Sequence, residues 1–371
     1  MSAREGPPVD IRPAEPDDGD ALIAAIETID RETEWLAAPG ERVAWAERPA
    51  ASLAALRDRG DGVYLIARRG GAIVGYLGAF AGQYRSTRGV LSIHHVGVRQ
   101  AARRQGIASR LLAALEDWTR ARGGHRLDLT VDVDNAPARA FYARHGFLEE
   151  GVIRDAAQDG LHDGARRHSY LALAKLIDGA AWPPLVGEPP ARRPPADSLT
   201  VRFRPIVEAD AAALRDWEIA LLAAPPAMLK QPDEVADPAG FAATLRELLA
   251  SPRHYLVGAR VDAAGGERIL GLVAASARPQ PRLQGDVGMI VNVLAECRGL
   301  GIGRRLFAIG EDWARTRGAH RLSTSLPACN PEGARFARAL GFAPEVVLRR
   351  YARFGDRHVD LLGFAKLLMP R

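Results

Sequence analysis

The sequence predicts two α/β domains in tandem, each with a twisted mixed β-sheet flanked by helices. A length of 371 residues suggests two domains at roughly 150 residues each. Three short motifs, Glu-Asp-Trp, His-Arg-Leu and Gly-Phe, each occur twice with the same separation of 195 positions. Both copies also alternate short extended runs with helical stretches. The first residues of the paired motifs are Glu116 and Glu311, His125 and His320, and Gly146 and Gly341.

The two copies are separated by a segment that cannot form a helix interior or a central strand. Residues 178–199 contain six prolines in three pairs. We interpret this segment as a semi-rigid linker. The predicted domains are therefore residues 1–177 and 200–371.

Each copy begins with a short strand and two helical stretches. Three extended runs follow, and then the first copy has an amphipathic helix with apolar residues at helical spacing from Ile107 to Trp118. Each copy ends with a strand, a helix and two more strands. The extended runs are residues 63–67, 72–80 and 90–98 in the first copy and 255–259, 269–275 and 287–293 in the second; the last strands are 171–176 and 361–367.

Composition excludes several classes of partner. The chain has 47% hydrophobic and 26% charged residues, a net charge of +5 and a pI near 9.5. Arginine alternates with acidic residues and no basic run reaches five, so we expect no nucleic-acid partner. Cys297 and Cys329 are too few for a disulfide framework or a zinc site, so we expect no metal. No apolar run reaches ~18 residues, and the first ten residues lack an apolar signal region. We expect a cytoplasmic protein without a membrane partner; the sequence leaves its oligomeric state open.

A strand-to-helix turn rich in small residues recurs in both copies. Such a turn lets a backbone approach a ligand, and its free N–H groups with the helix dipole favour an anion such as a pyrophosphate. A Walker A loop would need Gly-Lys-Ser/Thr, and the dinucleotide fingerprint is also missing. A helix that begins at glycine by chance is the alternative, and recurrence at one spacing argues against it. The turns comprise Arg103, Arg104, Gln105, Gly106, Ile107, Ala108 and Ser109, and Arg298, Gly299, Leu300, Gly301, Ile302, Gly303 and Arg304.

At these turns the sequence resembles the GNAT superfamily of N-acetyltransferases, whose signature is Arg/Gln-x-x-Gly-x-Gly/Ala. The resemblance covers both copies and extends to the block that begins at Asn135. It implies acetyl-CoA as cofactor, with its pyrophosphate on the turn amides and its pantetheine arm on the preceding strand. By resemblance, the cofactor-binding residues are Val96, Gly97, Val98, the first turn from Arg103 to Ser109, Asn135 and, in the second turn, Arg298, Gly299, Gly301, Gly303 and Arg304. The signature residues are Arg103, Gly106 and Ala108, and Arg298, Gly301 and Gly303.

The resemblance also implies a tyrosine that protonates the departing thiolate. Tyr142, which follows Phe141 and precedes the Gly146-Phe147 pair, takes that position. The position 195 residues later is Ala337, which cannot donate a proton. A core aromatic with a hydrated hydroxyl is the alternative for Tyr142. We therefore expect catalysis in the first copy and a catalytically degenerate second copy.

The resemblance also implies a catalytic base on the strand before the turn, as several members of the family have a Glu or His there. His94 and His95 stand there, and the 195-residue shift places Met289 and Ile290 at these positions in the second copy. Side chains alternate along a strand, so the two imidazoles are predicted to face opposite ways and only one to act. We choose His94, counting back from Val98; a histidine packed under a helix is the alternative.

An acidic segment with an aromatic residue follows the first helical stretch. Glu32, Glu34 and Trp35 would suit a cationic amine through Coulomb attraction and cation–π contact, although a charged helix end would look the same. The predicted function is acetyl-CoA-dependent N-acetylation of a primary amine on a small molecule or peptide. A noncatalytic acetyl-CoA-binding or sensing protein is the alternative.

Overall fold

The computed structural model describes residues 8–33, 35, 48–158, 167–180, 200–224, 228–263, 266–279, 283 and 285–368. The chain divides into two compact units. Unit 1 contains Met1–Gln83, Thr87–Glu150 and Leu171–Trp182, and unit 2 contains Tyr84–Ser86, Gly151–Tyr170 and Pro183–Arg371. Residues 151–170 of the first repeat thus belong to unit 2. Of the proline-rich segment 178–199, only 178–180 lie within the described residues.

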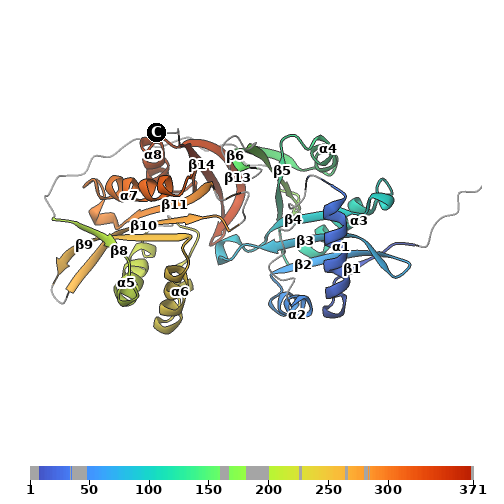
Figure 1. Ribbon diagram of the computed structural model, residues 1–371, viewed down its shortest axis with the longest axis horizontal. Helices are drawn as coiled ribbons and strands as arrows, with labels where there is room; N and C mark the ends of the chain where they lie inside the picture. The colour runs from blue at the N-terminus through green and yellow to red at the C-terminus, as the bar shows by residue number, and fades with distance from the viewer. Residues whose placement is uncertain are drawn as a thin grey trace, which may run out of the picture. The chain divides into compact units, whose positions relative to one another are not determined.

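The first repeat contains seven strands and four α-helices among its described residues (Figure 1). The elements follow the order expected from the sequence. In chain order they are β1 (Asp10–Pro13), η1 (Pro16–Asp18), α1 (Gly19–Arg31), α2 (Pro49–Arg59), β2 (Gly62–Arg69), β3 (Ala72–Ala81), η2 (Arg85–Thr87), β4 (Val90–Val98), η3 (Gln100–Ala102), α3 (Ile107–Arg120), β5 (Arg126–Asp132), α4 (Ala136–Arg144), β6 (Leu148–Gln158) and β7 (Arg167–Leu176).

The second repeat has the same succession of helices and strands in its described part. In chain order they are β8 (Arg202–Pro205), η4 (Glu208–Asp210), α5 (Ala211–Leu222), η5 (Pro232–Glu234), α6 (Pro238–Ala250), β9 (His254–Ala263), β10 (Gly266–Ala277), β11 (Asp286–Val293), η7 (Ala295–Cys297), α7 (Ile302–Thr316), β12 (Arg321–Pro327), α8 (Pro331–Ala339), β13 (Ala343–Phe354) and β14 (Arg357–Leu367).

Strand order is the same in the two repeats. It runs β1-β2-β3-β4-β5-β7-β6 in the first and β8-β9-β10-β11-β12-β14-β13 in the second. In each, one parallel pair, β4–β5 or β11–β12, follows a run of antiparallel strands. Within unit 2, Gly151 at the start of the β6 part pairs with Val346 of β13. The mixed α/β fold and the duplication are confirmed.

Helices cover both faces of the sheet in the first repeat. Gly75 and Tyr76 are neighbours on β3, so they point to opposite faces. A Cβ placed on Gly75 would lie 3.1 Å from Ile107 of α3, whereas one on Gly97, the partner of Tyr76, would lie 2.6 Å from Ile29 of α1. α3 therefore covers one face of the sheet, and α1 covers the other. Figure 1 shows the same division in the second repeat, with α5 and α6 on one side of the strands and α7 on the other.

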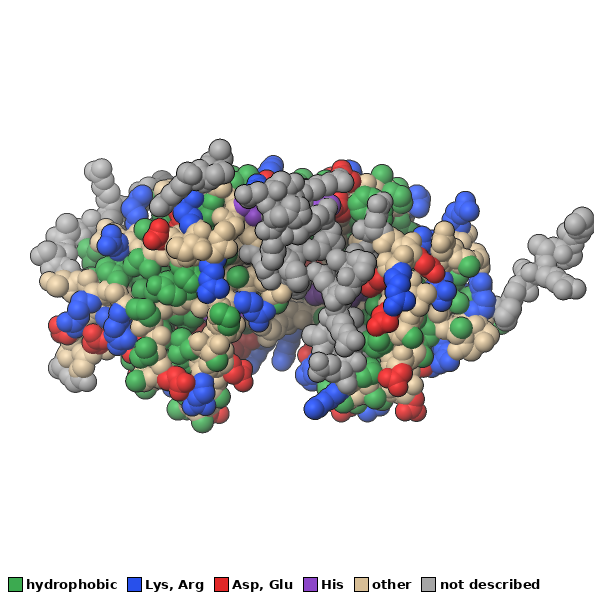
Figure 2. Space-filling model, viewed as in Figure 1, with side chains coloured by type: hydrophobic (Ala, Val, Ile, Leu, Met, Phe, Trp, Pro, Cys, Tyr) green, Lys and Arg blue, Asp and Glu red, His purple; other side chains and the backbone are tan. Residues whose placement is uncertain are grey.

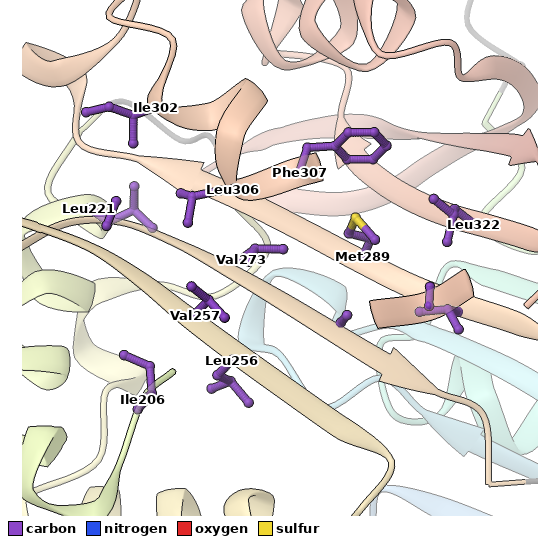
Figure 3. Packing of buried hydrophobic residues seen from close by; sticks show 14 of the residues in the cluster. Ile206, Leu221, Leu256, Val257, Val273, Met289, Ile302, Leu306, Phe307 and Leu322 are labelled. Carbon is purple, nitrogen blue, oxygen red and sulfur yellow. The ribbon is translucent and has the colours of Figure 1, made fainter. Parts of the chain in front are cut away.

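The core of the second repeat is built where α7 packs on the middle strands. Figure 3 shows Leu306 and Phe307 of α7 above Val273 of β10 and Met289 of β11, and all four belong to one buried cluster. All four side chains are almost fully buried. Small residues allow this close packing, because a Cβ on Gly310 of α7 would lie 2.9 Å from Val273. Burial of such side chains contributes roughly 1.5–3 kcal/mol each.

Two further expectations concern membranes and metals. Among the described helices, none is both long and apolar enough to cross a membrane. The described residues also contain no group of three or more His, Cys, Asp or Glu side chains arranged to hold a metal ion. On the face drawn in Figure 2, basic and acidic side chains are interspersed, as the alternation in the sequence predicts.

Candidate active site

The parallel pair β4–β5 separates soon after it begins. Val90, Leu91 and Ser92 pair with residues 126–128, and within these two described strands the pairing ends there. Within the described strands, the backbone N–H and C=O groups of β4 beyond Ser92 that face β5 therefore have no strand partner, although the Val98 carbonyl accepts a hydrogen bond from Arg103. The predicted pantetheine-binding residues 96–98 lie on this stretch. β11 and β12 separate at the same level, after Gly288 pairs with Ser323.

The turn before α3 presents backbone donors that no side chain of the described residues is seen to cap. Gly106, the N-cap residue, has φ 76°, and Arg104 has φ 62°. No side chain caps the helix, whose first bond runs from the Arg110 N–H to the Gly106 carbonyl. The amides of Ile107, Ala108 and Ser109 are left without intrahelical acceptors. A Cβ on Gly106 would meet nothing within 4 Å, so backbone conformation rather than crowding favours glycine there.

The second repeat reproduces this turn. Gly299 and Gly301 have φ 81° and 79°, and no side chain caps α7. Glycine at 299 relieves the strain that Arg104 accepts at the matching position. Both turns are thus shaped to seat an anion on helix N–H groups.

Three side chains of the two turns make hydrogen bonds to nearby residues of their own repeat. Arg103 donates from Nε to the Val98 carbonyl at 3.0 Å, and Arg298 donates in the same way to Val293 at 3.3 Å. Gln105 accepts from Arg69 at 2.7 Å and donates to the Ala101 carbonyl. Arg103, Arg298 and Gln105 therefore make hydrogen bonds within the loop, and all three, like Arg104, are exposed.

A β-bulge at His94 distinguishes β4 from its counterpart. Gly78 pairs with His95 and Ala79 with Ile93, so His94 is an extra residue without a partner on β3. The expectation that the two imidazoles face opposite ways is wrong. Their ring centroids lie 6.3 Å apart, because a bulge interrupts the strict alternation of side chains.

The two histidines have different environments. His94 is exposed and meets the edge of Phe80 at 5.2 Å between centroids, and His95 is partly buried. Loss of water around the imidazole lowers the pKa of His94, and the charge of Asp128 partly opposes this. Burial and the nearby His94 lower the pKa of His95 to about 4. Both shifts favour the neutral imidazole, the form that can accept a proton.

A buried ionic network lies where β4 and β5 are still paired. Asp128 accepts from the Ser92 hydroxyl at 2.6 Å and from Arg126 Nε at 3.2 Å. Arg126, fully buried, also makes two hydrogen bonds to Glu150, at 2.9 and 2.5 Å. The sequence analysis missed these residues, because a lone Asp or Ser on an alternating strand gives no signal of its partners.

Tyr142 lies on α4, which is bound to the first turn of α3. The Tyr142 side chain is buried at 8% exposure, meets Phe147 edge to face, and makes no hydrogen bond within the described residues. Burial raises the pKa of its hydroxyl, so the group keeps its proton at neutral pH. His145, one turn later, lies 3.0 Å from the hydroxyl of Ser109 on α3.

Asn135 is the N-cap of α4. Its side-chain oxygen accepts from the Ala138 N–H at 3.1 Å, and Asn330 makes the matching bond to Gly333 at 2.9 Å. This capping explains why both copies have asparagine here. The predicted contact of Asn135 with the cofactor stays a prediction.

A model of the acetyltransferase (GNAT) family matches residues 29–147 and 217–342, more than half of the chain. The chain belongs to the GNAT family. Each match contains one of the two glycine turns and the strand before it. The family resemblance and the two tandem GNAT domains are thereby confirmed.

Several acetyltransferases are similar to parts of the chain. The N-alpha-acetyltransferase RimI of Mycobacterium tuberculosis H37Rv is 40% identical over 91 residues, 24% of this chain and 55% of that protein. The chain thus spans about half the length of this curated relative. A GNAT acetyltransferase structure from Streptococcus pneumoniae is 26% identical, covering 46% of this chain and 99% of its own, with a TM-score of 0.41. YncA of Salmonella typhimurium, solved with acetyl-CoA, is 20% identical, covering 48% and 99%, with a TM-score of 0.40.

The end of α1 carries the acidic segment expected to meet an acceptor in this GNAT domain. Glu32 accepts hydrogen bonds from the Gln100 backbone N–H and from Arg99 Nε, the latter at 2.9 Å. Burial raises the pKa of Glu32, but these bonds and the charges of Arg99 and Arg103 outweigh it, and the pKa is lowered. The Glu32 carboxylate therefore has cationic partners from its own chain. Trp35 is 37% exposed, and Glu34 lies outside the described residues.

A second carboxylate, Asp30, begins the same acidic segment. Asp30 accepts from the Tyr76 hydroxyl at 3.1 Å, and the Tyr76 ring covers Gly97 of β4. Burial raises the pKa of Asp30, and the Tyr76 hydrogen bond opposes this. Only the folded structure brings these residues together, since they come from α1, β3 and β4.

The second GNAT repeat has the glycine turn, but its strand β11 has no bulge. Pairing along β10 and β11 is regular at this level, with Ala274 opposite Ile290 and Ala275 opposite Met289. Ile290 therefore matches His95, Met289 matches the core residue Ile93, and His94 has no counterpart. The sequence analysis matched His94 with Met289 by a constant shift of 195 residues, and this match is wrong. The shift of 195 holds for the residues after the bulge but not for those of β4 that precede it. A Cβ on Gly303 would lie 3.0 Å from the Phe336 ring, so packing of α8 favours a small residue there.

Proposed function

We propose that the first repeat catalyses acetyl-CoA-dependent acetylation of a primary amine on a small molecule or peptide. The observation that carries this proposal is that one repeat combines three features. These are His94 at a β-bulge, a Tyr142 hydroxyl that keeps its proton, and a glycine turn whose helix amides are uncapped. Ala337 and the regular β11 strand replace both groups in the second repeat. The proposed catalytic domain is residues 1–177.

The uncapped turn fits the pyrophosphate of acetyl-CoA. Amides of Gly106, Ile107, Ala108 and Ser109 would hold it, and the exposed guanidinium of Arg104 adds positive charge beside them. The open edge of β4 at residues 96–98 would receive the pantetheine arm. Bound there, acetyl-CoA supplies the thioester whose acetyl group is transferred.

In the proposed reaction the cationic amine first loses one proton to solvent, and His94 then removes a second proton as the neutral nitrogen forms a bond to the thioester carbon. Its lowered pKa keeps the imidazole neutral and able to accept that proton. Backbone amides in the unpaired stretch of β4 are suited to stabilise the developing oxyanion. When the carbon–sulfur bond breaks, the Tyr142 hydroxyl donates its proton to the thiolate, and solvent later restores it.

The acceptor class follows from two observations. Carboxylates at the end of α1, Asp30 foremost, suit an amine that arrives as a cation. The 40% identical relative is an N-alpha-acetyltransferase, which favours the α-amino group of a peptide or protein among primary amines. Glu34 and Trp35 remain proposed acceptor contacts. Glu32 would act through the loop that Arg99 and Arg103 hold.

A noncatalytic acetyl-CoA-binding role is a second candidate for the second repeat. Its turn, with Gly299 and Gly301 both in the left-handed region, is intact while the catalytic groups are replaced. Residues 200–371 are thus proposed as a degenerate domain that retains a CoA site.

The direct test is an acceptor screen with acetyl-CoA and the full chain. The panel contains peptides with different first residues, polyamines, aminoglycosides and amino acids, and the readouts are thiol release and intact mass of the product. A product heavier by one acetyl group on an amine supports the proposal. Tight CoA binding by calorimetry without any acetylated product would instead favour the binding protein.

A further inference from the structure

One histidine outside the groups assigned above connects two parts of the first-repeat site. His145 immediately follows α4 and is its C-cap residue. Its Nδ1 lies 2.8 Å from the Phe141 carbonyl and its Nε2 lies 3.0 Å from the Ser109 hydroxyl. The ring also packs on Phe141, with centroids 4.4 Å apart. The side chain is therefore held at three points.

The two hydrogen bonds define the proton position on the ring. A carbonyl oxygen only accepts, so Nδ1 must carry the hydrogen. In a neutral imidazole Nε2 is then an acceptor, and the Ser109 hydroxyl donates to it. His145 thus satisfies a carbonyl at the end of α4 and holds a side chain in the first turn of α3.

This bridge joins the pyrophosphate turn to the helix of Tyr142, and the proposed reaction depends on the relative position of these two parts. Ser109 lies in the turn assigned to the pyrophosphate, and Tyr142 lies one helical turn before His145 on α4. The Tyr142 carbonyl also accepts from the N–H groups of His145 and Phe147, so the tyrosine and the histidine share one rigid helix end.

The second repeat lacks the bridge together with the tyrosine. Leu340 stands in place of His145, Arg304 in place of Ser109 and Ala337 in place of Tyr142. Contact between α7 and α8 there includes the Phe336 ring beside Gly303, which is apolar. Apolar packing suffices to dock α8 on α7, so docking alone does not explain the polar bridge in the first repeat.

We propose that His145 is a positioning residue for acetyl transfer, which fixes Tyr142 relative to the pyrophosphate turn by joining α4 to Ser109. This inference rests on the proposed function of the first repeat. A displacement of about 1 Å at a reacting group can cost on the order of 10²-fold in rate. Loss of one hydrogen-bonded bridge with the apolar contacts retained should cost less, about 10-fold in kcat.

The test is a set of variants assayed with acetyl-CoA and the fastest acceptor of the screen. His145→Leu, which copies the second repeat, and Ser109→Ala should each lower kcat about 10-fold with the KM for acetyl-CoA changed less than about 3-fold. The double variant should be no slower than either one. Ser109→Thr, which keeps the hydroxyl, should retain most of the wild-type rate.

The decisive comparison is made in the Tyr142→Phe background. Because His145 acts through the tyrosine hydroxyl, adding His145→Leu to Tyr142→Phe should lower kcat no further. A full additional 10-fold loss there, or a wild-type kcat in His145→Leu alone, would overturn the inference while leaving the proposed function in place. If Tyr142→Phe itself is as fast as the wild type, the proposed role of Tyr142 fails, and this inference fails with it.

A spectroscopic readout separates positioning from folding. At pH 8, long-range ¹H–¹⁵N spectra should show His145 as the Nδ1–H tautomer, and Ser109→Ala should shift its Nε2 resonance. The melting temperature and the calorimetric affinity for CoA should stay close to wild type in Ser109→Ala. If His145→Leu does not fold, Ser109→Ala alone carries the kinetic test, and an Nε2–H tautomer in the wild type would contradict the bridge.

Discussion

β4 and β11 occupy the same place in two repeats of one fold, yet they differ by a single residue of register. Both precede a glycine turn, both separate from a parallel neighbour after three pairs, and both fasten their last carbonyl with an arginine. Only β4 contains the bulge, which places His94 and His95 on one side. The comparison teaches that the turn and the proposed catalytic groups are separable, because the second repeat has the turn without those groups.

The largest expected effect comes from Tyr142→Phe, which keeps the ring and its packing but removes the hydroxyl. A general acid contributes on the order of 10²- to 10⁴-fold, so turnover should fall by that range with CoA affinity unchanged. Equal losses in kcat and kcat/KM, measured by steady-state kinetics, would mark a transition-state role. The matched control is Ala337→Tyr, which should add no activity because β11 lacks the bulge. Near wild-type turnover in Tyr142→Phe would remove the main difference between the repeats.

Deletion of His94 tests the bulge itself by giving β4 the register of β11. The regular pairing of β10 and β11 shows that the fold accommodates this register, so the variant should fold, as judged by circular dichroism. We expect a loss of turnover of about 10²-fold or more, and a smaller one for His94→Gln, which keeps the bulge. Equal losses in the two variants would show that the imidazole matters and the bulge does not.

Gly106→Asp tests the anion site that the repeats share. A carboxylate would stand beside the bound pyrophosphate, so the Kd for CoA at this repeat should rise on the order of 10-fold or more. Gly301→Asp should do the same at the second repeat and leave turnover unchanged. Calorimetry with CoA on the single and double variants measures both sites. Unchanged binding in the double variant would contradict the assignment of both turns.

The smallest effect concerns stability and pH at His95, whose counterpart Ile290 does not titrate. The pKa is lowered to about 4, below the ordinary value of about 6.5, because the fold disfavours the imidazolium. The neutral ring therefore contributes stability that is present above about pH 6.5 and is lost as the pH falls toward 4. Between pH 7 and pH 4 the free energy of unfolding should fall less in His95→Gln than in the wild type. The difference between the two falls should be on the order of 2 kcal/mol. Urea unfolding at the two pH values measures this; parallel losses would mean that His95 does not titrate in this range.

Much of the fold and part of the site could be predicted from the sequence. Repeated motifs at one spacing predicted the duplication, and the alternation of extended and helical runs predicted the mixed sheet. Gly106 and Gly301 mark the turns because a left-handed backbone favours glycine, which is a local requirement readable from one position. Ala337 in place of Tyr142 was equally readable, because α4 and α8 match without a gap.

The rest depended on pairings between distant segments. The bulge at His94 is set by how β4 registers on β3, and a fixed shift along the sequence cannot show an extra residue. Glu32 looked like a free acceptor contact until the fold brought Arg99 and Gln100 to it. The bond between His145 and Ser109 joins residues 36 positions apart, one just after α4 and the other in α3. Local conformational preference and hydrophobic pattern were thus determined by the sequence alone, whereas the partners of polar side chains were decided by tertiary structure, because a hydrogen bond requires atoms within about 3 Å whose approach only the packed fold fixes.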